Sequence, residues 1–105
     1  MESRPVNKTF FCKLIPPRSS FAQDLSPAEA KLMQDHAVYW KELMAKGYVV
    51  TFGLVGDPAG AYGIGILECE DDDAVRSLTD NDPTIKARQG FRYEIQPMPR
   101  GAVHP

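Results

Sequence analysis

The most constraining feature of this 105-residue sequence is a helix with clear signals at both ends, between Ser26 and Gly47. Ser26 is followed by Pro27, which suits the first helical position, and by Glu29, which completes a capping box with Ser26. At the other end, Gly47 supplies a left-handed cap, a conformation that glycine adopts without steric cost. Because a helix in water is stabilised mainly by burying one face, the rest of the chain must supply a surface that covers it.

The apolar face of this predicted helix contains one titratable residue. At about 100° per residue, His36 lies near the middle of that face. The apolar side chains around it are Leu32, Met33, Ala37, Trp40, Leu43 and Met44. Two interpretations compete: His36 is a core histidine with one ring nitrogen hydrogen-bonded, or it is a general acid or base. The second interpretation requires a partner that fixes the tautomer and a cavity that receives a substrate, both from elsewhere in the chain.

The remaining sequence predicts four strands, which alternating or β-branched apolar patterns mark. They cover residues 8–15, 48–55, 61–69 and 91–96. The turn-forming sequence from Gly56 to Gly60 makes the second and third strands an antiparallel hairpin. In the third strand Ala61, Gly63 and Gly65 share one face. Such a row of small residues either lets another segment pack closely, which is the commoner case, or leaves a hollow.

A second, shorter helix is predicted over 74–79, directly after the acidic run 70–73. Carboxylates at a helix N-terminus cap the helix and suit its dipole, so capping is favoured over metal binding for this run. Asp82-Pro83 interrupts the helix and restarts it as a brief turn through Ala87. Asp82 is expected to be the N-cap of that turn, with Pro83 at its first position.

The order strand, helix, strand, strand, helix, strand indicates an α+β protein of ferredoxin-like fold, with a four-stranded antiparallel sheet and both helices on one face. The first strand is apolar on both sides, with Phe10 and Leu14 on one side and Phe11 and Ile15 on the other. Whichever pair points away from the helices exposes apolar area, and a second copy of the chain is the usual cover. We therefore expect a homodimer whose two sheets face each other.

Composition argues against several classes of function. The chain is predicted to be one domain, 1–105, with loose termini at 1–7 and 98–105. A formal net charge of −2 gives no electrostatic reason to expect nucleic acid or an anionic membrane as a partner, and no apolar run is long enough for a signal peptide or a membrane span. Cys12 and Cys69 are expected to be buried reduced thiols rather than a bridge, consistent with a cytoplasmic protein. No metal site is predicted, because the histidines and cysteines match no zinc spacing.

Several of these features occur together in one known family. They are the histidine inside the first helix, the glycine that closes it, Phe52-Gly53 in the second strand, the Asp82-Pro83 pair, and the closing strand FRYEIQPM. In this combination the sequence resembles the YciI-like (YCII-related) family from about Lys8 to Met98. The resemblance implies a small dimeric α+β barrel of ferredoxin-like fold. The sequence departs from the family at Phe52-Gly53-Leu54, where many relatives have Gly-Pro, so the shape of this pocket wall does not follow from the resemblance.

The resemblance also implies a histidine–aspartate pair that has been proposed as catalytic in the family. By position, His36 matches the histidine and Asp82 matches the aspartate. One branch of the family includes a dehydrochlorinase that acts on a chlorinated hydroxyhydroquinone. The implied activity is that of a lyase or isomerase without a cofactor, acting on a small organic substrate such as an aromatic or carbonyl compound. The residues expected to bind this substrate are Tyr39, Trp40, Phe52 and Gly53.

Two other functions are compatible with the sequence. The chain could be a non-catalytic binding or regulatory dimer whose pocket holds a small ligand, with His36 as a hydrogen-bonding contact. It could also be a domain that assembles with a larger enzyme. Capping alone explains Asp82 before Pro83, but capping does not exclude catalysis, because one carboxylate oxygen can cap while the other faces His36.

Overall fold

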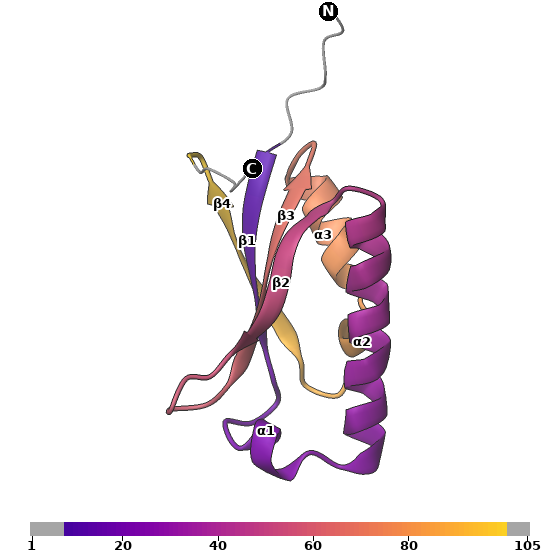
Figure 1. Ribbon diagram of the computed structural model, residues 1–105, viewed down its shortest axis with the longest axis vertical. Coiled ribbons are helices and arrows are strands. Elements are labelled where there is room, and N and C mark those ends of the chain that lie inside the picture. The colour runs from indigo at the N-terminus through magenta and orange to yellow at the C-terminus, as the bar shows by residue number, and fades with distance from the viewer. Residues whose placement is uncertain (1–7, 101–105) are drawn as a thin grey trace, which may run out of the picture.

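The computed structural model describes residues 8–100 and confirms the α+β ferredoxin-like fold (Figure 1). Four strands form one antiparallel sheet in the order β2-β3-β1-β4. The strands are β1 (Lys8–Ile15), β2 (Val49–Val55), β3 (Tyr62–Cys69) and β4 (Arg92–Met98). The helices are α1 (Phe21–Asp24), α2 (Pro27–Ala45), α3 (Asp72–Asp80) and α4 (Pro83–Lys86). In Figure 1 the helices α2 and α3 lie on the same side of the sheet.

The predicted elements agree with the observed ones to within one residue at each end, apart from three larger differences. β4 continues to Met98 because β1 is long enough to pair with it there, through Thr9. The predicted loose tail is therefore wrong for Met98, while residues 1–7 and 101–105 lie outside the described part of the chain. α3 begins at Asp72 rather than Ala74, because its N-cap is Asp71, whose side chain accepts a hydrogen bond from the Ala74 N–H at 2.8 Å. The helix α1 was not predicted, since four residues are too short to show a helical period.

The signals at the two ends of α2 act as predicted. The hydroxyl oxygen of Ser26 accepts a hydrogen bond from the Glu29 N–H at 3.1 Å, and the Glu29 carboxylate accepts one from the Ser26 N–H at 2.8 Å. The helix ends with Lys46 as its cap and Gly47 at a φ of +89°. One predicted member of the apolar face is wrong: Met44 is 40% exposed, because it lies in the last turn beyond the edge of the core.

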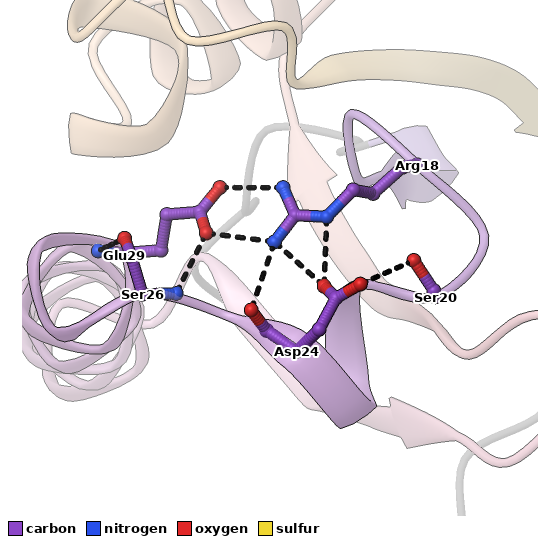
Figure 2. A network of polar contacts seen from close by, with 5 residues as sticks. All are labelled: Arg18, Ser20, Asp24, Ser26 and Glu29. Atoms are coloured by element: carbon purple, nitrogen blue, oxygen red, sulfur yellow. Dashed lines mark hydrogen bonds and ion pairs between the residues drawn. The ribbon is translucent and has the colours of Figure 1, made fainter.

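An arginine joins α1 to the start of α2 (Figure 2). The guanidinium of Arg18 donates to both carboxylate oxygens of Glu29, each at 2.8 Å, and to Asp24 at 2.7 Å. The hydroxyl of Ser20 donates to the second oxygen of Asp24 at 2.7 Å. The hydrogen bond from Arg18, assisted by the Ser26 N–H, lowers the pKa of Glu29 to about 2. The network therefore holds α1 beside α2 while Glu29 also caps that helix.

The core lies between the sheet and the helices. From β1, the side chains of Phe10, Cys12 and Leu14 point toward the helices and are 3% exposed or less. Both cysteines are buried free thiols, and burial raises the pKa of Cys12 to about 12 and that of Cys69 to about 11. Among the helices described for residues 8–100, none combines the length and the apolarity of a membrane span.

The face of the sheet that points away from the helices carries apolar side chains. Because side chains alternate along a strand, Phe11 and Ile15 point to this face, and the register places Ile66 opposite Phe11. Its partly exposed apolar residues are Phe11, Ile15, Val55, Tyr62, Ile64, Ile66 and Met98. We call this set the open sheet face.

Candidate functional site

His36 and Asp82 are in direct contact although 46 residues separate them in the sequence. His36 lies midway along α2, and Asp82 is the N-cap of α4. Nδ1 of His36 is 2.7 Å from Oδ2 of Asp82. The Asp82 side chain is fully buried, whereas that of His36 is 13% exposed. The helix therefore brings the imidazole to a carboxylate from a distant part of the chain, and the catalytic use of the pair stays a prediction.

The Asp82 carboxylate accepts five hydrogen bonds. Oδ2 accepts from Nδ1 of His36, from the indole N–H of Trp40 at 2.7 Å and from the hydroxyl of Tyr93 at 2.5 Å. Oδ1 accepts from the backbone N–H and the hydroxyl of Thr84, at 2.9 and 2.8 Å. Oδ1 therefore caps α4 while Oδ2 faces His36, so the Asp82 carboxylate serves as a helix cap and as the partner of His36 at the same time.

This environment keeps Asp82 ionised. Burial by itself raises the pKa of Asp82, but the hydrogen bond and charge of His36 and the hydrogen bonds of Tyr93 and Thr84 outweigh it, so the pKa lies below the ordinary value for aspartate. An ionised carboxylate only accepts hydrogen bonds, which assigns the hydrogen to Nδ1 of His36. Nε2 is then the ring nitrogen left to take or give a proton. Burial and the charge of Asp82 raise the pKa of Tyr93, so its phenol stays protonated.

Trp40 reaches Asp82 by lying against β3 at Gly65. A Cβ atom on Gly65 would lie 2.2 and 2.4 Å from two ring carbons of the indole, distances that real structures do not show. The indole is 2% exposed and packs against the ring of Phe52, with centroids 5.8 Å apart. Gly65 is therefore a position of close packing, the commoner of the two interpretations of the small-residue row.

Gly63, two residues earlier on the same face of β3, lies at a hollow. A Cβ there would meet only Leu14 at an ordinary contact distance of 3.4 Å, and the Gly53 carbonyl beyond it. Gly63 lines a cavity of about 10 Å³ beside His36, which is room for about one water molecule. It also lines a cavity of about 240 Å³ between α1, α2 and the hairpin β2–β3. We call the larger cavity the apolar chamber; its walls include Leu14, Phe21, Met33, Leu54, Ala61 and Gly63.

Of the four residues predicted to bind substrate, only Trp40 lines the small cavity beside His36. The hydroxyl of Tyr39 donates to the Leu78 carbonyl at 2.6 Å, and burial raises the pKa of Tyr39 to about 12. Phe52 packs behind Trp40, and Gly53 is an exposed residue of the edge strand β2. None of Tyr39, Phe52 and Gly53 lines either cavity, so their binding roles stay predictions.

Two contributors to the site were missed in the sequence. No local sequence signal identifies Tyr93, because its contact with Asp82 depends on the register that pairs it with Leu14. Thr84 could have been inferred, since the second helical residue after an N-cap aspartate offers its N–H to the carboxylate. Within residues 8–100, no group of three or more His, Cys, Asp or Glu side chains is placed to hold a metal ion.

Comparison with known proteins gives one family and several structures. The family model of the YCII-related domain matches residues 9–99. The structure of NE2512, a protein of unknown function from Nitrosomonas europaea, is 12% identical with a TM-score of 0.54, covering 97% of this chain and 99% of that one. PA3566 from Pseudomonas aeruginosa is 15% identical with a TM-score of 0.52, covering 95% and 100%. No curated protein matches the chain. At these identities the two structures show a shared fold alone.

Proposed function

Because the chain belongs to the family of YCII-related domains, we propose that it is an enzyme of the lyase or isomerase type that needs no cofactor. The His36–Asp82 pair would move a proton on a small organic substrate, such as an aromatic or carbonyl compound. The observation that carries this proposal is the 2.7 Å contact between Nδ1 of His36 and a fully buried, ionised Asp82. That contact fixes the tautomer and leaves Nε2 for chemistry.

The pair would work through Nε2 in both directions. Neutral His36 takes a proton from a carbon next to a carbonyl or on an activated ring, and Asp82 stabilises the imidazolium that forms. In an isomerisation the proton returns to another carbon of the substrate. In an elimination the electron pair of the broken C–H bond forms a double bond, while a leaving group such as chloride departs with its own electron pair. Asp82 stays ionised throughout, because its hydrogen bonds lower its pKa.

We expect His36→Gln to lower turnover by roughly 10²- to 10⁴-fold, because glutamine can donate to Asp82 but cannot relay a proton. The melting temperature should stay close to that of the wild type, since glutamine keeps a polar group at a partly exposed position. The assay follows chloride release from chlorinated hydroquinones, and deuterium uptake by small carbonyl compounds in D₂O. His104→Gln, which replaces the other histidine of the chain, serves as the matched control. Equal turnover by the wild type and His36→Gln would contradict the proposal.

A second candidate function is a non-catalytic dimer that binds or senses a small ligand. The observation that favours it is the small volume beside His36, about 10 Å³, which admits little more than one atom group. In this case the wild type turns over none of the chlorinated hydroquinones or carbonyl compounds in the assay. His36→Gln then weakens ligand binding without any kinetic effect, and this pattern separates the two functions.

We also propose that two copies associate through the open sheet face. Its apolar side chains support this, because such a surface on a four-stranded sheet is usually covered by a second copy. The wild type is expected to have twice the mass of the chain in light scattering, and Ile66→Asp, at the centre of the face, to have the mass of one chain. Val38→Asp places the same charge on an exposed position of α2 and should remain a dimer. A monomeric wild type at micromolar concentration would refute the dimer.

A further inference from the structure

We infer that the apolar chamber binds an uncharged end of the substrate, a single ring or a short alkyl chain. Gly63 is then the position that determines whether this group can lie next to His36. The inference rests on the proposed function of the His36–Asp82 pair and adds the class of substrate that the pair can reach. It is carried by the volume of the chamber, by its lining, and by the two residues it shares with the cavity at His36.

The chamber has the size and chemistry of a site for one apolar group. Its volume is about 240 Å³, and a dry apolar cavity of about 150 Å³ is enough to hold benzene. No charged side chain lines it. One wall contains Phe21 and Phe91, whose rings meet edge to face with centroids 5.2 Å apart, and Met33 adds an adaptable thioether. A charged group placed here would lose its hydration without gaining a partner, so the chamber selects against one.

The chamber adjoins the cavity at His36 across Leu14 and Gly63, which line both. Because Gly63 has no side chain, the space next to Leu14 stays open; a Cβ on Gly63 would lie 3.4 Å from Leu14. A group that fills the chamber therefore places its near end beside the imidazole. On the other side Leu54, an apolar residue that is 72% exposed, marks where the chamber meets solvent.

Gly63→Ala tests the inference without disturbing the fold. The added methyl group meets its nearest neighbour at an ordinary contact distance, so the melting temperature should stay close to that of the wild type. The probe is p-cresol, a neutral ring with one polar end, titrated while the methyl signal of Met33 is followed by NMR. We expect saturable binding to the wild type and about tenfold weaker binding to Gly63→Ala, because the methyl group takes up space at the junction.

Two controls make the test specific. Gly56→Ala makes the same replacement just beyond the end of β2, where a Cβ would meet nothing within 4 Å, and should bind p-cresol as the wild type does. The second probe, 4-hydroxybenzoate, has a polar group at both ends, so whichever end enters the chamber buries one of them. It should bind at least about tenfold more weakly than p-cresol.

The outcomes separate the chamber from the proton-transfer site. A Met33 signal that p-cresol does not move, or equal binding by Gly63→Ala and the wild type, would overturn the inference. Turnover that depends on His36 but is unchanged in Gly63→Ala would also overturn it, while leaving the proposed function intact. If p-cresol binds as expected, His36→Gln binds it within about twofold, and the wild type turns over nothing, the chamber stands and the proposed function fails.

Discussion

Gly65→Ala is expected to lower the free energy of unfolding by about 3 kcal/mol, near the upper end of the cost of overpacking a core. The reason is that the new Cβ would lie 2.2 Å from the Trp40 ring, so that either the indole or the strand must shift. The indole is 2% exposed, is packed against Phe52, and is bonded through its N–H to Asp82. Urea unfolding measures the loss, and the NMR signal of the indole N–H reports whether Trp40 leaves Asp82.

Gly53→Ala provides a matched control for this loss of stability. It makes the same change in the same sheet, but the new Cβ meets no atom within 4 Å, so stability should change by about 0.5 kcal/mol or less. If both variants lose the same small amount, the cost comes from the backbone of a strand glycine, and close packing of Trp40 on Gly65 is not the cause.

Asp82→Asn is expected to cost about 3 kcal/mol, although it changes hardly any volume. An amide has one acceptor oxygen and one donor NH₂ group, whereas donors meet both oxygens of Asp82. The hydroxyls of Tyr93 and Thr84 can turn and accept, but the Trp40 N–H and the Thr84 backbone N–H only donate. If the NH₂ group replaces Oδ1, the buried Thr84 N–H loses its partner. If it replaces Oδ2, the Trp40 N–H faces NH₂ and keeps only the Tyr93 hydroxyl, 3.0 Å away.

The pH dependence of stability gives a second measurement on the same variant. The folded pKa of Asp82 is lowered, so its ionisation contributes stability above about pH 4, the pKa range of an unfolded aspartate. That contribution is lost as the pH falls through the lower folded pKa. The free energy of unfolding measured with urea should therefore depend less on acid pH in Asp82→Asn than in the wild type.

The control for the loss of stability is Asp80→Asn, which replaces an exposed carboxylate two residues away. Its stability should match that of the wild type to within about 0.5 kcal/mol. An equal loss in both variants would show that the five hydrogen bonds to Asp82 are not the cause.

Local signals made most of the fold predictable. The bounds of β1 and the caps of α2 follow from residues that act within one turn or one strand, such as Ser26 with Glu29. α1 could not be predicted in this way, because it is held by Arg18 contacts that reach across eleven residues to Glu29. The extension of β4 to Met98 likewise depends on its pairing with β1 rather than on its own composition.

The site was only partly predictable, because it depends on distances between elements. Periodicity places His36 on the buried face of its helix, but only the family resemblance connected it with Asp82. The row of small residues in β3 carried two interpretations, and each holds at a different glycine: close packing at Gly65 and a hollow at Gly63. The sequence pattern does not distinguish Gly65 from Gly63. The two positions differ only in what faces them, which is the Trp40 indole at Gly65 and a cavity at Gly63.

Asp82 both caps α4 and contacts His36. This double role affects how catalytic activity can be inferred for other proteins with this fold. A relative without catalytic activity would still lose stability if this aspartate were replaced. The reason is that Asp82 caps α4 and accepts hydrogen bonds from the Trp40 indole and the Tyr93 phenol. The presence of this aspartate in a relative is therefore weak evidence for catalytic activity. The His36 imidazole is partly exposed and supplies only one of the hydrogen bonds to Asp82. Its replacement should therefore cost less stability, so the presence of this histidine in a relative is the more informative sign of catalytic activity.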